Sequence, residues 1–140
     1  MIKVVLDTNV YISGILFGGK SETIRRLAKE GKIVILVSEE ILAELAGVLK
    51  RKFNWLDWQI SELIEDIRAF ATLVIPAFHL SIIKKDDQDN RFLECAIEGK
   101  AQYIVTVDKQ HLQSLKKYKE IEILSPDRFL EVDRIKSMLK

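Results

Sequence analysis

The sequence has one cysteine, Cys95, and two histidines, His79 and His111, among its 140 residues. A single cysteine cannot form a disulfide within the chain, and it fits a reducing compartment such as the cytoplasm. Structural zinc sites need several Cys and His ligands at short spacings, which these residues do not provide. The sequence therefore predicts neither a disulfide framework nor a zinc site.

Long apolar stretches are also absent. No run approaches the ~18 residues that a membrane span needs, and the segment MIKVVLDTN reaches a charge at Asp7 before a signal-peptide core could form. We therefore expect a cytoplasmic protein with no membrane partner. Repeats, low-complexity tracts and linkers rich in Pro, Gly or Ser are missing too, so residues 1–140 are expected to form a single domain.

The chain has little excess of either charge. Its 22 Lys and Arg residues nearly balance 21 Asp and Glu residues, for a net charge of +1. Any basic surface for nucleic acid must therefore be local. The chain also lacks a Gly-rich phosphate loop and a Gly-x-Ser-x-Gly motif, so no pattern points to a protein nucleophile.

Short apolar runs alternate with helical patterns along the chain. The strands are expected at residues 2–6, 33–37, 73–75, 103–107 and 120–124. Helices are expected between them, with Ser21, Ser38 and Ser125 as N-caps. This alternation is typical of parallel pairing through right-handed crossovers. The predicted fold class is α/β, a three-layer α/β/α sandwich with a central, mostly parallel sheet.

Four acidic residues are expected to meet at one edge of this sheet. Asp7 follows the first strand and Asp108 the fourth, and ligands of open α/β sheets bind at the carboxyl ends of the strands. Asp89 opens a helix after the loop at 84–88. Glu44 lies beside the apolar stripe that contains Leu45, so it points toward the sheet.

Each acid also has an ordinary structural interpretation. Asp7 or Asp89 could cap a helix, Glu44 could be solvated, and Asp108 could belong to a turn. Their combination is more informative, because two carboxylates about 4 Å apart repel by roughly 4 kcal/mol at an effective dielectric of 20. Such a cluster needs a cation or raised pKa values. Oxygen ligands suit Mg²⁺ or Mn²⁺, which are common in phosphate-ester hydrolysis.

Three segments resemble a known family. They are VVLDTNVYISGIL at residues 4–16, SEEILAELAGVL at 38–49 and DDQDNRFLECAIEGKAQYIVTVD at 86–108. In this order they resemble the PIN-domain ribonucleases, especially the VapC-like toxins of toxin–antitoxin systems.

The resemblance implies a site and its partners. It implies catalytic and metal-binding roles for Asp7, Glu44, Asp89 and Asp108, with Asp86 and Asp87 as alternatives near Asp89. It implies supporting polar roles for Thr8, Asn9, Asn90 and Thr106. It further implies Mg²⁺ or Mn²⁺ as cofactor, RNA as substrate, a homodimer, and a small antitoxin protein as partner if the chain is a toxin.

Other features leave alternatives open. Arg91 and Lys109 adjoin proposed ligands, so they either contact RNA or belong to a solvated surface. The basic residues 50–52 are expected to form a solvated surface. Cys95 is expected to be a packed thiol. An aromatic cluster is expected to be core between the two middle helices or else a partner surface. Its members are Phe53, Trp55 and Trp58.

Two other functions compete with a ribonuclease. A phosphoacceptor domain of the response-regulator type also has acids at strand ends, but it needs an early acidic pair, whereas Asp7 stands alone. A non-catalytic RNA- or protein-binding module on the same fold is the stronger alternative.

Overall fold

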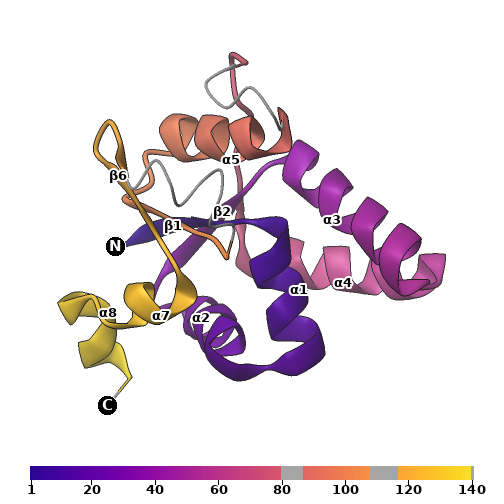
Figure 1. Cartoon of the computed structure of the whole chain (residues 1–140), viewed down its shortest axis with the longest axis horizontal. Coiled ribbons are helices and arrows are strands. Elements are labelled where there is room, and N and C mark those ends of the chain that lie inside the picture. Colours follow the sequence, from indigo (N-terminus) through magenta and orange to yellow (C-terminus); the bar gives the residue numbers. More distant parts are fainter. Residues whose placement is uncertain (80–86, 108–116, 140) are drawn as a thin grey trace.

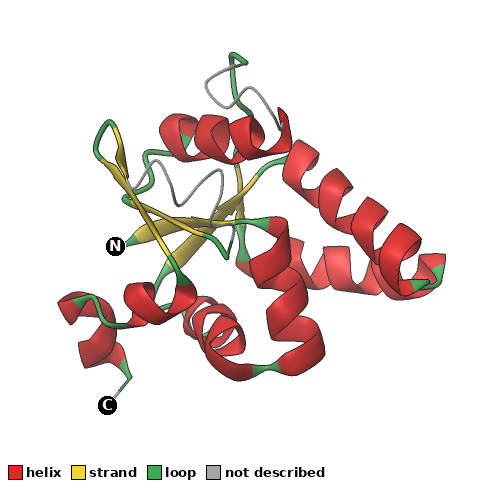
Figure 2. Cartoon of the chain, viewed as in Figure 1, coloured by secondary structure: helices red, strands yellow, loops and turns green. Residues whose placement is uncertain are grey.

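The computed structural model describes residues 1–79, 87–107 and 117–139. The strands are β1 (Lys3–Leu6), β2 (Val34–Val37), β3 (Thr72–Leu73), β4 (Tyr103–Val105), β5 (Lys117–Tyr118) and β6 (Ile121–Leu124). The helices are α1 (Thr8–Phe17), α2 (Gly19–Lys29), α3 (Glu39–Phe53), α4 (Asp57–Phe70), α5 (Asp87–Glu98), α7 (Pro126–Leu130) and α8 (Asp133–Met138) (Figure 2). None of the helices in these ranges is long and apolar enough to cross a membrane.

The strands form one sheet in the order β3-β2-β1-β4-β6-β5. All neighbours pair in parallel except β5 and β6, which are antiparallel. Helix α5 covers one face of the sheet, and α1 and α2 lie across the other, with α7 beside α2 (Figure 1). The α/β/α sandwich with a mostly parallel sheet is therefore confirmed.

The strand order reverses between β1 and β4. The chain runs outward from β1 through β2 to β3, and then returns to place β4 on the other side of β1. The amide of Asp7 donates to the carbonyl of Val105 at 3.0 Å, so the ends of β1 and β4 meet. Such a reversal leaves a crevice at the carboxyl ends of the strands, where α/β proteins bind ligands.

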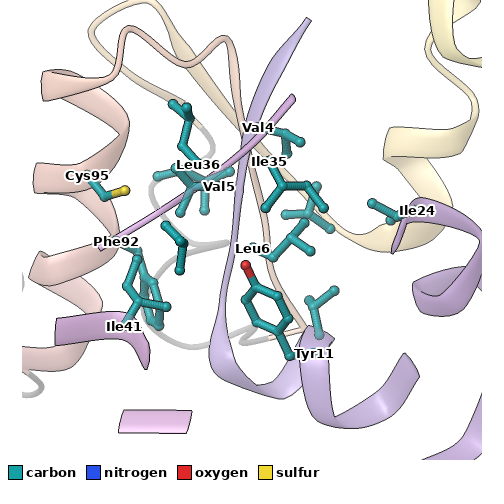
Figure 3. Packing of buried hydrophobic residues seen from close by; sticks show 14 of the residues in the cluster. Val4, Val5, Leu6, Tyr11, Ile24, Ile35, Leu36, Ile41, Phe92 and Cys95 are labelled. Atoms are coloured by element: carbon teal, nitrogen blue, oxygen red, sulfur yellow. The ribbon is translucent and has the colours of Figure 1, made fainter. Parts of the chain in front are cut away.

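Apolar side chains fill the space on both faces of the sheet. Phe92 and Cys95 reach toward the sheet from α5, while Tyr11 and Ile24 pack from α1 and α2 on the other side (Figure 3). Strands that are covered on both faces are apolar at consecutive positions, which is why β1 reads as a continuous run.

Helix starts were predicted with mixed success. Ser38 and Ser125 cap α3 and α7 as expected, and each hydroxyl accepts a backbone N–H three residues later. Ser21 is wrong as a cap. Helix α2 begins at Gly19, because Gly18 and Gly19 adopt φ of 75° and 65° and turn the chain sharply out of α1.

Two boundaries near the site also differ from the prediction. Helix α5 starts at Asp87, so Asp89 lies in its first turn and does not open it. Strand β4 ends at Val105, two residues earlier than expected. Thr106 and Val107 therefore already belong to the segment that leaves the sheet.

The aromatic cluster is mostly surface. Phe53 is 41% exposed and Trp58 is 60% exposed, and only Trp55 packs partly against the core. A core position was the wrong prediction for Phe53 and Trp58, because both lie where α3 ends and α4 begins, beyond the reach of the sheet.

Candidate active site

Asp7 lies at the centre of the strand reversal and is 3% exposed. One carboxylate oxygen, Oδ1, caps α1 by accepting the N–H of Val10 at 2.9 Å. The other, Oδ2, accepts a hydrogen bond from the hydroxyl of Thr106 at the end of β4. The capping role and a site role are compatible, because each carboxylate oxygen has two lone pairs and these hydrogen bonds use one of each pair.

Two threonine hydroxyls flank this carboxylate. Thr106 is fully buried and is held by Asp7. Thr8, the next residue after Asp7, is 6% exposed, and its Oγ1 makes no hydrogen bond in the described part of the chain. An unsatisfied buried hydroxyl costs about 1–3 kcal/mol, so it is a position that a bound ligand or water would satisfy. The local donor set is made of oxygen atoms, which fits a hard divalent cation.

Glu44 lies on α3, half-buried between the buried residues Ile41 and Leu45. Helix α3 packs against α5. Glu40, one turn earlier on the same face of α3, is close enough to Cys95 of α5 to contribute to its raised pKa. Glu40 on α3 therefore lies toward α5, while the prediction that Glu44 points toward the sheet and the site stays a prediction.

Helix α5 places three polar side chains near the sheet. Asn90 and Glu94 are fully buried, and Arg91 has 18% of its side chain exposed. Arg91 Nη2 lies 3.0 Å from Glu94 Oε2, and His79 Nδ1 lies 3.4 Å from Glu94 Oε1. Arg91 Nη1 is also 2.9 Å from His79 Nδ1. The guanidinium of Arg91 thus compensates a buried carboxylate.

Glu94 was missed by the sequence interpretation. The signal was present, because an acid between Leu93 and Cys95 interrupts an apolar helix face one turn after Asn90. A single acid in such a position is usually solvated, and only the fold shows that this one has no exposed surface.

Two buried groups near Asp7 stay neutral at ordinary pH. Burial raises the pKa of Tyr11, and the neighbouring Cys95 and Asp7 raise it further against an opposing effect of Arg25. Burial, with a smaller contribution from Glu40, raises the pKa of Cys95 to about 12. Cys95 is therefore the packed thiol that was expected, and neither group is available as a base.

The structure thus brings together part of the predicted set. Asp7 and Thr106 are in contact, Thr8 adjoins them, and Asn9 is exposed. Asp89 lies in α5 but its side chain is outside the described structure, and Asp86, Asp108, Lys109 and His111 lie outside the described residues. Within the three described ranges, no group of three or more His, Cys, Asp or Glu side chains could hold a metal ion. The four-acid cluster stays a prediction.

Comparisons with known proteins identify a family and a relative of similar length. A family model described as PIN domain matches residues 3–110. An uncharacterized protein of Methanocaldococcus jannaschii is 31% identical over 142 aligned positions, which cover 93% of this chain and 90% of that protein.

Two solved structures share the fold. VapBC2 of Rickettsia felis, determined with a DNA fragment from its promoter, matches with a TM-score of 0.62 and 20% identity, over 87% of this chain and 97% of that chain. VapC20 of Mycobacterium tuberculosis, a toxin that cleaves the sarcin-ricin loop, matches with a TM-score of 0.56 and 16% identity, over 85% and 98%.

Proposed function

Because the chain belongs to the PIN domain family, we propose that it is a divalent-metal-dependent endoribonuclease that hydrolyses phosphodiester bonds in RNA. The observation that carries the proposal is the position of Asp7, which is buried at the strand reversal and fixed by Thr106, while the hydroxyl of the next residue, Thr8, has no partner among the described residues. This arrangement favours an oxygen-liganded cation at the edge where α/β proteins bind substrates.

Four acids would hold the ion, which is Mg²⁺ or Mn²⁺ in this proposal. They are Asp7, Glu44, Asp89 and Asp108. When bound, such an ion lowers the pKa of a ligated water and stabilises charge on the phosphate. The protein contributes orientation, because the hydrogen bonds of Asp7 to Val10 and Thr106 restrict its carboxylate to one direction. Asn90 and Thr106, both fully buried, would support the site as polar residues behind the metal ligands.

The proposal also includes a role as the toxin of a toxin–antitoxin system. The similar structures include a VapBC assembly and a toxin that cuts ribosomal RNA. By extension, this chain would be a cytoplasmic toxin that forms a homodimer and is inhibited by a small antitoxin. Contact with RNA through Arg91 and Lys109 stays a prediction. The guanidinium of Arg91 also has a structural role, because it pairs with the buried carboxylate of Glu94.

A mutation series tests the activity. The purified chain with Mn²⁺ should cleave a labelled single-stranded RNA, and Asp7→Asn, Glu44→Gln and Asp89→Asn should each lower the rate by about 100-fold or more, beyond the 10- to 100-fold typical of residues that only support a metal ligand. Glu62→Gln, which changes an exposed acid on α4, should cleave like wild type.

The outcomes separate the competing functions. Unchanged cleavage by Asp7→Asn, or by wild type in EDTA, would show that the acids do not bind an essential metal. RNA binding without cleavage in Mn²⁺ would favour the non-catalytic module. Growth arrest on expression that Asp7→Asn abolishes would support the toxin assignment.

A further inference from the structure

A pocket of about 400 Å³ opens beside the proposed site, between α1, α2 and α7. Val107 is one of its lining residues, and it follows Thr106, whose hydroxyl binds Asp7. The pocket therefore begins one residue away from the carboxylate that carries the proposed function. Asp7 and Glu44, the two assigned metal ligands whose side chains the structure describes, do not line it.

The first turn of α2 forms one wall of this pocket. The cap residue Gly18 offers no side-chain hydrogen bond. The amides of Gly19, Lys20 and Ser21 find no acceptor among the residues that the structure describes. Among the described residues, nothing lies within 4 Å of the position that a Cβ would take at Gly18 or Gly19, so the chain that leads into α2 borders open space. Unsatisfied amides at a helix N-terminus attract anionic oxygen, phosphate above all.

Ser21 gives independent support for a ligand. The residue is 6% exposed and lines the pocket, and no hydrogen bond of its hydroxyl is found within the described ranges. Its Oγ is not among the fully buried unpartnered atoms of these ranges, so a ligand in the pocket can reach it. The first turn of α2 therefore offers a hydroxyl as well as amides to whatever occupies the pocket.

The rim combines a cation with an aromatic ring. Lys20 Nζ lies 3.1 Å from Asp127 Oδ1, but the two side chains are 60% and 71% exposed, and such pairs contribute about 0–1 kcal/mol. A phosphate oxygen can therefore take the place of Asp127. Phe17, also on the lining, is 81% exposed. An exposed ring next to a basic group is the usual platform for an unpaired base.

We propose that this pocket is a nucleotide subsite, which holds one phosphate of single-stranded RNA against the first turn of α2 and Lys20 while an adjacent base stacks on Phe17. The inference rests on the proposed ribonuclease function and specifies how its substrate is held. Because Val107 lines the pocket and follows Thr106 in the chain, RNA bound here would extend toward the segment that holds Asp7.

Binding measured in EDTA tests the subsite without metal chemistry. The probe is a fluorescein-labelled single-stranded RNA, followed by anisotropy as salt is varied. Lys20→Ala should weaken binding and reduce the salt slope by about one, as for the loss of one phosphate contact. Phe17→Ala should weaken binding by about fivefold or more, the lower end for losing one stacked base. Asp127→Asn should tighten binding, because it removes the carboxylate that competes for Lys20.

Matched variants on another surface serve as controls. Lys52→Ala and Phe53→Ala remove an exposed cation and an exposed ring near the end of α3, and both should bind RNA like wild type. In NMR spectra, RNA should shift the amides of Gly19, Lys20 and Ser21. Inorganic phosphate should shift the same amides with lower affinity, and its effect should not depend on Phe17.

Several results would overturn the proposal. One is an RNA affinity equal to that of wild type in both Lys20→Ala and Phe17→Ala. Another is an NMR titration in which RNA does not shift the amides of Gly19, Lys20 and Ser21. In either case the exposed ring of Phe17 would be assigned to a protein partner. If these results occur while wild type still cleaves RNA in Mn²⁺, only the subsite is wrong. If wild type neither binds nor cleaves RNA, the proposed function fails as well.

Discussion

The threonines next to Asp7 differ in whether their hydroxyls have a hydrogen-bond partner. Thr106 donates to Asp7 Oδ2, whereas the hydroxyl of Thr8 is buried without a partner in the described structure. Both side chains cost free energy to bury, and only Thr106 recovers it within the protein. Thr106 therefore acts as a positioning residue for Asp7.

Thr106→Val should weaken the proposed site without unfolding the chain. Loss of the hydrogen bond frees the carboxylate of Asp7 to rotate, so Mn²⁺ affinity and cleavage should each fall by about 10- to 100-fold. Thr106→Ser keeps the hydroxyl and should restore both. Isothermal titration with Mn²⁺ measures the affinity, and Thr72→Val on β3 makes the same change at an exposed threonine. Equal Mn²⁺ affinity in Thr106→Val and wild type would remove the positioning role.

Glu94→Gln should destabilise the fold. The substitution removes the buried carboxylate that pairs with the guanidinium of Arg91, and breaking a buried pair costs about 3–5 kcal/mol. Urea denaturation should show a loss of at least about 2 kcal/mol, since the amide can still accept a hydrogen bond. In Arg91→Met the further loss from Glu94→Gln should be smaller. Additive losses would mean that the two side chains are not coupled.

Residues differ in how far the sequence could predict them. Asp7 was predictable, because a charge that ends an apolar run lies at a strand end. Thr106 was identified only through the family resemblance, since a threonine in a strand pattern has no signal of its own. The burial of Glu94 depends on Arg91 and on His79, which lies 3.4 Å from it but belongs to another segment, so no local pattern contains it.

Helices α2 and α4 are joined by a polar clamp. Arg25 Nη2 lies 2.6 Å from Asp66 Oδ2, and Lys29 Nζ lies 3.2 Å from the same oxygen. Both cations also lie over the ring of Phe70, at 6.0 and 5.7 Å from its centroid. Partial burial opposes ionisation of Asp66, but the hydrogen bonds from Arg25 and Lys29 outweigh it and hold its pKa below the usual value.

Asp66→Asn should lower stability in a pH-dependent way. A carboxylate whose pKa is lower in the folded chain stabilises that chain above the unfolded pKa of about 3.9, and the contribution is lost as the pH falls through the folded value. At neutral pH the loss should be about 1 kcal/mol, a modest figure because Asp66 is 40% exposed. Calorimetry should show the wild-type and variant melting temperatures converging as the solution is acidified.

The control for this clamp is another acid on α4. Asp57 pairs with Lys50 at 3.1 Å, but the side chains are 83% and 65% exposed. Asp57→Asn should therefore change stability by less than about 0.5 kcal/mol at neutral pH. An equal effect of the two substitutions would mean that the clamp between α2 and α4 adds nothing beyond an ordinary surface charge.

Elements were easier to predict than their ends. The helical periodicity of α3 and α4 and the serine caps of α3 and α7 are local features, so sequence alone located them. Helix α2 begins earlier than expected because Gly18 and Gly19 turn the chain before Ser21 can cap it. Strand β5 has two residues, too few for any alternation to show.

The arrangement of the whole molecule depends on two strands, β1 and β4, that are far apart in the sequence and adjacent in the sheet. The alternation of strands and helices predicts a parallel sheet, but not that β4 returns beside β1. This return brings the end of β4 beside Asp7. The strand pattern predicts that Asp7 and Asp108 share the carboxyl edge of the sheet, but not which strands are neighbours. Asp108 and the side chain of Asp89 lie outside the described structure, so their part in the site stays a prediction.

Metal binding should stabilise the entire fold if the proposed site exists. A ligand that binds only the folded chain adds about 2.7 kcal/mol at a concentration roughly 100 times its dissociation constant. For a domain of this size, Mn²⁺ should then raise the melting temperature by roughly 5–10 °C over that in EDTA. Differential scanning calorimetry on wild type and Asp7→Asn measures the effect, which the variant should lack. A similar rise in both proteins would place the metal elsewhere.

The hydrogen bond between Thr106 and Asp7 joins residues 99 positions apart. During translation the carboxylate is made long before its partner hydroxyl, and β1 has no neighbour on that side until β4 has emerged. A chain still on the ribosome therefore contains Asp7 before Thr106 and β4 are in place to fix its carboxylate. If the finished protein cuts RNA, its own messenger and ribosome are exposed to it only after β4 has been made and has paired with β1.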